Sequence, residues 1–366
     1  MSSRVTAVVG ARPNFIKVAP VLHALEGVDI RLLHTGQHYD PSLSGWFIER
    51  LRMPAPDANL GVGSGSHAQQ TAGVITGVES DLREHPADLV LVAGDVNSTM
   101  AAALAATKAG VAVAHVESGL RSRDWGMPEE INRIVTDRVS DLLLCTSEDA
   151  VANLEGEGIA GDGVRLVGNT MIDSLERMLD GLDRAGVLAA HGVESRAFAL
   201  VTLHRPALVD DPAQLGAVID ALGRLASELP VLFPAHPRTV ARLAGIEPPA
   251  GLRLMEPLDY AEFIALEAEA RLVITDSGGV QEETSVLGVP CITYRTTTER
   301  PITVELGTNT VLGLDPARIL DVPELIRSRP REGRIPPLWD GNASRRIVDV
   351  LARTFEDTRS FQTAPA

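Results

Sequence analysis

Short apolar runs alternate along the chain with longer segments of helical periodicity. In the first half the apolar runs are Val5–Val9, Ile30–His34, Leu89–Ala93, Ala112–Val116, Leu142–Thr146 and Val164–Val167. In the second half they are Ala199–Leu203, Val231–Pro234, Leu252–Met255, Leu272–Thr275 and Cys291–Tyr294. Because successive positions in a run are apolar, each run is predicted as a strand buried on both faces of a parallel sheet.

Helices are expected between these strands, for example over Ala68–Arg83, Thr99–Lys108 and Gln214–Glu228. Strands that alternate with helices are typical of parallel βαβ units. Two such series predict an α/β protein with two Rossmann-like domains whose parallel sheets face a central cleft. Ligands of such sheets bind beyond the carboxyl ends of the strands, so the residues after each strand carry the functional information.

The division between the domains is expected in a linker within residues 168–196. Its second part, Ala185–Arg196, contains two glycines and little periodicity. The N-terminal domain would then cover residues 1–168 and the C-terminal domain 169–342. A last amphipathic segment, Ala343–Phe355, predicts one more helix that caps one of the domains.

Composition narrows the classes of function. The 366 residues include 33 basic and 49 acidic side chains, a formal net charge of −16. This charge argues against nucleic acid as a partner but leaves room for a local basic pocket. The apolar run near the N-terminus is too short for a signal peptide, and no run approaches the ~20 residues of a membrane span. We therefore expect a cytoplasmic protein.

The cysteines and histidines do not form a pattern typical of a metal site. The two cysteines, Cys145 and Cys291, lie in apolar runs and are expected as small buried strand residues. His34 and His38 follow the second strand, in a loop that also contains Gln37. Metal binding by these two histidines is an alternative, but no carboxylate–histidine framework surrounds them. We expect neither a metal nor a cofactor.

The first strand is followed by two cations at a predicted helix start. The segment from Gly10 does not match the GxGxxG pattern of nicotinamide sites. Arg12 lies at the turn and Lys17 lies about one helical turn further on. Cations at the positive end of a helix dipole suit a phosphate, although both side chains could instead be solvated.

Carboxylates follow the third and fourth strands and begin the next helix. Asp95 lies where catalytic carboxylates occur, although an N-cap role is equally consistent with its position. Glu117 ends an apolar strand, which is costly unless the charge is paired or functional. Glu129 is four residues before Arg133, so a plain surface ion pair is the alternative to a functional role.

The second domain places histidines and a glycine pair after its strands. His204 follows the first of these strands and His236 the next. The step Ser277-Gly278-Gly279 opens a helix and would let backbone N–H groups approach a phosphate closely, and Glu283 could reach ribose hydroxyls. A helix cap with packed glycines is the alternative. Together these residues suit a phosphorylated, hydroxyl-rich substrate and proton-transfer chemistry.

These segments closely resemble the non-hydrolysing UDP-N-acetylglucosamine 2-epimerases. The matching segments, in order from residue 10 to about 309, are GARPNFIKVAPV, HTGQHYD, GDVNST, HVESGLRS, PEEINR, VGNTMID, TLHRP, HPRT, TDSGGVQEE, TERP and GTN. The resemblance implies a glycosyltransferase-B-like fold in which the C-terminal helix, here 343–358, returns to the N-terminal domain. It also implies a homodimer.

The resemblance implies reversible epimerisation at C2 of UDP-N-acetylglucosamine. In the family, UDP is eliminated across C1–C2 to give 2-acetamidoglucal and is then added back with protonation from the other face. This implies Asp95, Glu117 and Glu129 as acid–base carboxylates and His204, with Arg12, Lys17 and Arg133, as stabilisers of the leaving group. The implied UDP-binding residues are His236, Ser277, Gly278, Gly279, Glu283 and Arg300.

The chain departs from the family pattern after His204. Ala207 and Leu208 stand where many members have Glu and Asn, so the exact UDP-sugar is open. A modified UDP-sugar, such as a 2,3-diacetamido uronic acid, is one alternative, and a hydrolysing epimerase that releases UDP and N-acetylmannosamine is another. Gln37 and His38 are present, so a second UDP-N-acetylglucosamine is a candidate allosteric activator.

Overall fold

The computed structural model describes residues 3–36, 50–235, 237–243, 248–328 and 333–363. Within these ranges the side chains of residues 12, 206–207, 237–238, 328 and 356–363 are not described. The chain forms two compact units. Unit 1 consists of Met1–Ser174 and Pro337–Ala366, and unit 2 of Leu175–Pro336. The expected domain boundaries, 168/169 and 342/343, lie six residues from these.

Unit 1 contains a seven-stranded parallel sheet with the order β3-β2-β1-β4-β5-β6-β7. Its strands are β1 (Arg4–Val9), β2 (Asp29–His34), β3 (Ala58–Asn59), β4 (Leu89–Ala93), β5 (Ala112–Ser118), β6 (Leu142–Cys145) and β7 (Val164–Leu166). Its helices are α1 (Arg12–Ala24), α3 (His67–Glu84), α4 (Asn97–Lys108), α5 (Pro128–Val139), α6 (Glu148–Gly156), α7 (Thr170–Leu179, ending in unit 2) and α16 (Ala343–Thr363).

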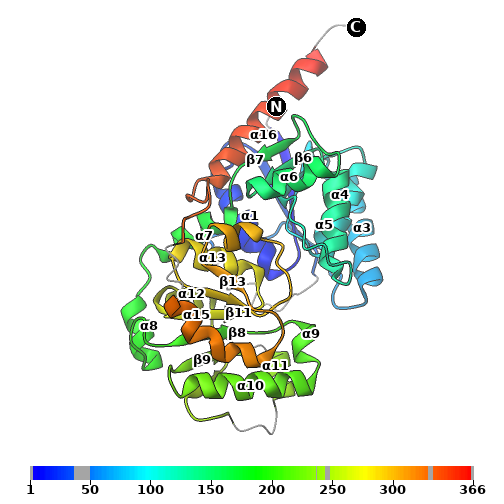
Figure 1. Ribbon diagram of the computed structural model, residues 1–366. Coiled ribbons are helices and arrows are strands. Elements are labelled where there is room, and N and C mark those ends of the chain that lie inside the picture. The colour runs from blue at the N-terminus through cyan, green and yellow to red at the C-terminus, as the bar shows by residue number, and fades with distance from the viewer. Residues whose placement is uncertain (1–2, 37–49, 236, 244–247, 329–332, 364–366) are drawn as a thin grey trace. The chain divides into compact units, whose positions relative to one another are not determined.

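Helices α3, α4 and α5 lie side by side along the unit 1 sheet (Figure 1). Val74 and Val78 of α3 and a run of alanines in α4 bury their apolar side chains against Val90 and Val92 of β4. The small alanine side chains let α4 approach its neighbours closely. Helix α16 packs on α1, and Trp339, just before it, donates a 2.9 Å hydrogen bond to the carbonyl of Thr146. The C-terminal helix therefore belongs to unit 1.

Unit 2 contains a six-stranded parallel sheet with the order β10-β9-β8-β11-β12-β13. Its strands are β8 (Ala199–Thr202), β9 (Val231–Pro234), β10 (Leu252–Met255), β11 (Leu272–Thr275), β12 (Cys291–Thr293) and β13 (Asn309–Val311). Its helices are α8 (Arg184–His191), α9 (Pro206–Val209), α10 (Pro212–Ala226), α11 (Pro237–Arg242), α12 (Tyr260–Glu269), α13 (Gly278–Leu287), α14 (Pro301–Glu305), α15 (Val322–Ser328) and the 3-10 helix η1 (Pro316–Asp321).

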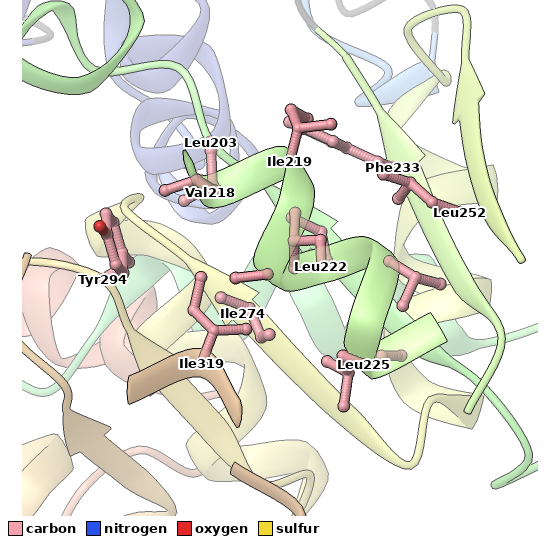
Figure 2. Close-up of a cluster of buried hydrophobic side chains, with 14 of the residues drawn as sticks. Leu203, Val218, Ile219, Leu222, Leu225, Phe233, Leu252, Ile274, Tyr294 and Ile319 are labelled. Carbon is pink, nitrogen blue, oxygen red and sulfur yellow. The ribbon is translucent and has the colours of Figure 1, made fainter. Parts of the chain in front are cut away.

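The core of unit 2 forms between α10 and the sheet. Figure 2 shows Val218, Leu222 and Leu225 of α10 directed toward the strands, where they meet Phe233 and Ile274. A separate cluster, which includes Phe198, Leu266 and Val280, packs α8, α12 and α13 against the sheet. The sheet is thus buried by apolar side chains from two sets of helices, as the unbroken apolar strands require.

The observed fold confirms two Rossmann-like parallel sheets, with differences in detail. The two-residue strand β3 and strand β13 were not predicted, since neither is an apolar run. Within the segment expected as an irregular linker, α8 forms because the Asp183 side chain caps Gly186 N and α8 packs on α12. Cys145 and Cys291 are buried strand residues, as expected, and burial raises the pKa of each thiol to about 12.

Candidate active site

The unit 1 candidates gather at the carboxyl edge of the sheet, around its topological switch point. Strand β1 lies between β2 and β4, and chain connections leave in opposite directions there. The residues after β1 and β4 therefore meet at one edge. Gly10 follows β1, and a Cβ there would stand 2.3 Å from the Ser98 hydroxyl and 2.4 Å from the Thr35 hydroxyl. Only glycine fits this crossing.

A buried ion pair joins the ends of two neighbouring elements at this edge. Lys17, on the second turn of α1, places Nζ 2.7 Å from Oε1 and 2.7 Å from Oε2 of Glu117. Both side chains are at least 95% buried. Glu117 has a φ of +68°, and the pairing of β5 with β6 shifts register between Val116 and Ser118. Lys17 is thus paired rather than solvated.

Asp95 is held by α5 rather than capping α4. The N-cap of α4 is Val96, so the N-cap alternative for Asp95 is wrong. Nη1 of Arg133 lies 2.5 Å from Oδ2 of Asp95, and Asn132 donates to the Asp95 carbonyl at 2.8 Å. The Asp95 side chain is 23% exposed, while that of Arg133 is 2% exposed. A charged group reachable by a ligand is therefore fixed by a buried guanidinium.

Glu130, the neighbour of the predicted Glu129, is a buried acid of α5. Glu130 accepts from Arg133 at 2.6 Å and from the backbone N–H groups of Ser122 and Arg123. Burial would raise the pKa of Glu130, but these hydrogen bonds and the Arg133 charge outweigh it and lower the pKa. Glu129 itself is half-buried at the start of α5. A plain surface pair of Glu129 with Arg133 does not fit, because Arg133 is buried.

In unit 2, His204 and Asp276 come together because β8 and β11 are parallel neighbours. Nδ1 of His204 lies 3.0 Å from Oδ1 of Asp276, and Oδ2 accepts the backbone N–H groups of His204 and Arg205. Burial would raise the pKa of Asp276, but the His204 contact and these N–H donors lower it. The His204 ring is 46% exposed while its carboxylate partner is buried. This pair resembles the way catalytic histidines are oriented.

The Ser-Gly-Gly step lies against a cluster of buried charges. Ser277 is the N-cap of α13, and a Cβ on Gly278 would stand 2.3 Å from Nη1 of Arg300. Arg300 pairs with Glu299 at 2.5 Å and with Glu282 at 2.8 Å. Arg295 also pairs with Glu299, and Arg205 lies 4.0 Å from it. Three guanidinium groups therefore face two carboxylates beside the α13 N-terminus, an arrangement that favours an anion.

Glu283, on the second turn of α13, is buried. It accepts a 2.5 Å hydrogen bond from the Tyr260 hydroxyl. Burial raises the pKa of Glu283 to about 7, although the Tyr260 bond acts in the opposite direction. Glu267 of α12 is fully buried as well, and burial together with the charge of Glu283 raises its pKa. Glu283 is thus an acid that changes charge near neutral pH.

Some candidates lie outside the described part of the chain. They are Gln37, His38 and His236, together with the side chain of Arg12, whose backbone begins α1. The allosteric role of Gln37 and His38 stays a prediction. His34 is buried, stacks on Phe15 with 5.6 Å between ring centroids, and accepts a hydrogen bond from Gly36 N. Among the described residues no group of three or more potential metal ligands occurs.

Sequence reasoning missed several ionisable residues that the structure places around the candidates. They are Glu130, Asp137, Arg205, Tyr260, Glu267, Asp276 and Arg295. Asp276 follows an apolar strand directly, the same signal that singled out Glu117. Tyr260 and Glu267 lie inside a helix and carry no such signal. Chemically, unit 1 offers proton transfer by carboxylates, and unit 2 offers an oriented histidine beside an anion-binding cluster.

Comparison with known proteins identifies the family of the chain. The profile of the UDP-N-acetylglucosamine 2-epimerase family matches residues 21–352. A UDP-N-acetylglucosamine 2-epimerase of Methanocaldococcus jannaschii is 38% identical over 95% of this chain and 98% of its own length. A UDP-2,3-diacetamido-2,3-dideoxy-D-glucuronate 2-epimerase of Pseudomonas aeruginosa is 37% identical over 96% of this chain and 99% of its own length.

A solved structure of a similar enzyme matches the fold of this chain. The crystal structure of the Methanocaldococcus jannaschii UDP-GlcNAc 2-epimerase in complex with UDP-GlcNAc and UDP matches with a TM-score of 0.89. That match is 37% identical and covers 96% of this chain and 99% of the other. Within the described residues no helix is long and apolar enough to cross a membrane. The family match spans most of the chain, and the chain therefore belongs to the UDP-N-acetylglucosamine 2-epimerase family.

Proposed function

We propose that the protein interconverts UDP-N-acetylglucosamine and UDP-N-acetylmannosamine without net hydrolysis. In the first step a base takes the C2 proton, the C1=C2 bond forms, and the C1–O bond breaks with its electrons going to UDP. The product of this step is 2-acetamidoglucal. In the second step UDP adds back at C1 while an acid protonates C2 from the other face.

The observation that carries the proposal is the buried Lys17–Glu117 pair at the carboxyl edge of the unit 1 sheet. A fully buried charge is costly and a salt bridge of this kind is weak evidence for stability, so a functional reason is the better account. Asp95, fixed by Arg133, and Glu129 complete the set of carboxylates that the reaction needs near C2.

The departing UDP needs cations and donors, which both units offer. We assign the diphosphate to Ser277, Gly278, Gly279, Arg300 and His236, and the ribose hydroxyls to Glu283. His204, oriented by Asp276, would act on the leaving group together with Arg12, Lys17 and Arg133. Hydrogen-bond donors placed where negative charge develops are worth about 10²–10³ in rate each.

Proton NMR of the protein with UDP-N-acetylglucosamine in deuterated water tests the proposal. The expected result is UDP-N-acetylmannosamine, deuterium at C2 of both UDP-sugars, and little free UDP. Accumulation of UDP and free N-acetylmannosamine would instead identify a hydrolysing epimerase. If no UDP-sugar of a broad panel exchanges its C2 proton, the proposal is wrong.

A second candidate substrate is a modified UDP-sugar such as a 2,3-diacetamido uronic acid derivative. Two observations favour it. The segment after His204 carries Ala207 and Leu208 in place of polar residues, and the relative from Pseudomonas aeruginosa is named for such a substrate. Comparing kcat/KM for the two UDP-sugars decides between them, and a preference of tenfold or more for the uronic acid would favour this second candidate.

A further inference from the structure

Asp137, on the last turn of α5, is a buried carboxylate that contacts β5 and the turn that follows it. It is 1% exposed. Oδ1 lies 2.7 Å from Nδ1 of His115, in β5. Oδ2 accepts from the backbone N–H of Gly119 at 3.1 Å and from Nη1 of Arg121 at 2.7 Å. One side chain thus contacts the chain on both sides of Glu117.

His115 carries this contact across to the neighbouring strand. Its Nε2 lies 2.9 Å from the carbonyl oxygen of Gly94, the residue before Asp95. The imidazole ring of His115 therefore bridges a carboxylate oxygen and a carbonyl oxygen. The backbone N–H of Gly94 in turn donates to the Val116 carbonyl at 3.0 Å. Asp137 is therefore connected through one imidazole ring to the loop that carries Asp95.

The backbone at Glu117 needs such support. A φ of +68° is uncommon for a residue with a side chain, and it persists only where the surrounding structure fixes it. His115 lies two residues before Glu117 and Gly119 two residues after it, and both are bonded to Asp137. At Gly119 itself, a Cβ would stand 2.3 Å from the carbonyl of Ala150, so the backbone of this turn packs directly on α6.

The charged groups around Asp137 stabilise this hydrogen-bonded network. Burial would raise the pKa of Asp137, but His115 and Arg121 outweigh it and lower the pKa. Arg121 is also held by Glu157, with 2.7 Å and 2.8 Å hydrogen bonds to its two oxygens. A fully bonded buried network of this kind is rigid, and removing one member disturbs the others.

We propose that Asp137 is a positioning residue that fixes Asp95 and Glu117 relative to each other, acting through His115 and the Gly119 amide. The inference rests on the proposed function, because it assigns those two carboxylates to the reaction. The expected effect on the rate comes from the position of the reacting groups. A displacement of about 1 Å in a reacting group can cost 10²-fold in rate.

The first test is the Asp137→Asn variant, measured by steady-state epimerisation and by UDP binding. The amide retains the shape but has one acceptor oxygen in place of two and no charge, so Asp137's acceptor contact is lost on the His115 side or on the Gly119 side. We expect kcat to fall by about 100-fold, with KM and the Kd for UDP changed less than threefold. A merely structural role would lower the amount of folded protein and leave kcat per folded molecule unchanged.

His115→Gln is the second variant, in case Asp137→Asn does not fold. It removes the ring that reaches the Gly94 carbonyl and leaves the Asp137–Arg121 and Asp137–Gly119 bonds in place. The matched control is Asp81→Asn. Asp81 is also a buried carboxylate of unit 1 and forms three hydrogen bonds with Arg31, but among the described residues it contacts no candidate site residue. We expect this control to lose thermal stability and keep kcat.

Hydrogen–deuterium exchange separates this inference from the proposed function. Peptides that contain Gly94 and residues 116–119 should exchange faster in Asp137→Asn than in the wild type, and equally in Asp81→Asn and the wild type. Unchanged exchange in these peptides, or a wild-type kcat in both network variants, would overturn the inference. A wild type that exchanges no C2 proton of any UDP-sugar would refute the proposed function and leave the exchange result to decide this one.

Discussion

Lys17 and Glu117 are 100 residues apart in the sequence, yet Nζ of Lys17 lies 2.7 Å from both carboxylate oxygens of Glu117. The pair links the second turn of α1 to the end of β5. Removing one partner of a buried pair leaves the other charge uncompensated, which costs about 3–5 kcal/mol. The two side chains must therefore be considered together when either is replaced.

Glu117→Gln should abolish most turnover while UDP still binds. The amide keeps the shape of the side chain but cannot accept the C2 proton, and positioned acid–base groups contribute about 10²–10⁴-fold in rate. Initial rates and UDP calorimetry on the same preparation measure both effects. Glu79→Gln, at an exposed pair with Arg83, is the control that should change neither. Wild-type turnover in Glu117→Gln would remove Glu117 from the acid–base set.

Asp276→Asn should slow turnover through its effect on His204. The asparagine oxygen can still accept backbone N–H groups, but the Nδ1 contact at 3.0 Å loses its charged partner. The ring, which is 46% exposed, would then sample other orientations. We expect kcat to fall by about tenfold or more, up to the 10²–10³ that one donor to a developing charge contributes. Single-turnover release of UDP is the direct measurement, and an unaltered rate would contradict the pairing's role.

UDP binding should weaken as the pH falls below about 7. The pKa of Glu283 is about 7 in the unliganded protein, and the carboxyl must lose its proton to accept hydrogen bonds from ribose hydroxyls. The Kd for UDP should therefore rise about tenfold per pH unit below 7 and become constant above 8. The stability of the fold depends on pH in the opposite direction. A carboxyl whose pKa is raised in the folded state stabilises the unliganded fold at low pH, and this stabilisation is lost as the pH rises through about 7.

Glu283→Gln is the control for this pH dependence. The terminal phosphate of UDP also titrates, and that contribution is the same for both proteins. Subtracting the variant's profile from the wild type's isolates Glu283. Calorimetry at pH 6, 7 and 8 suffices, and identical profiles for the two proteins would show that Glu283 does not titrate on binding.

Leu222→Ala should lower the stability of unit 2 strongly. Leu222 is fully buried on α10, in the cluster drawn in Figure 2. Loss of a buried leucine side chain costs about 2–5 kcal/mol, depending on how far the cavity relaxes. Denaturant unfolding gives the change in free energy. Leu320→Ala, at a position 39% exposed, should cost less than about 1 kcal/mol, and equal effects of the two variants would contradict this core.

Strand positions could be predicted well because both faces of each sheet are buried. Leu89–Ala93, Val231–Pro234 and Leu272–Thr275 have the predicted bounds, since apolar residues occupy nearly every position of each run. Strand β13 was missed because Asn309 is a buried polar residue, which hydrogen bonds with Thr293 and Gln281 satisfy. Tertiary partners of this kind are invisible in a local pattern.

In the candidate site, too, some positions follow from the local pattern and others depend on tertiary partners. Asp95, Glu117 and His204 follow predicted strands, so their place at a sheet edge follows from the strand pattern. The places of their hydrogen-bond partners do not follow from that pattern. Asp137 and Glu130 lie on a helix whose polar positions resemble a solvated face until the neighbouring turns are in place. Which carboxylate is buried was also not predictable, because Glu129 and Glu130 are adjacent and only the helix orientation distinguishes them.

Unit 1 is assembled from two separated stretches of chain, and this affects the order of events during synthesis. Unit 2 is one continuous stretch, so all of it leaves the ribosome before α16 does. The carboxylate of Asp173, however, accepts from the backbone N–H groups of Ala343 and Ser344, which are translated 170 and 171 residues later. Domains fold as units while synthesis proceeds. While unit 2 is synthesised, the surface of unit 1 on which α16 packs is therefore still uncovered. Unit 2 is the first unit whose whole chain has been made.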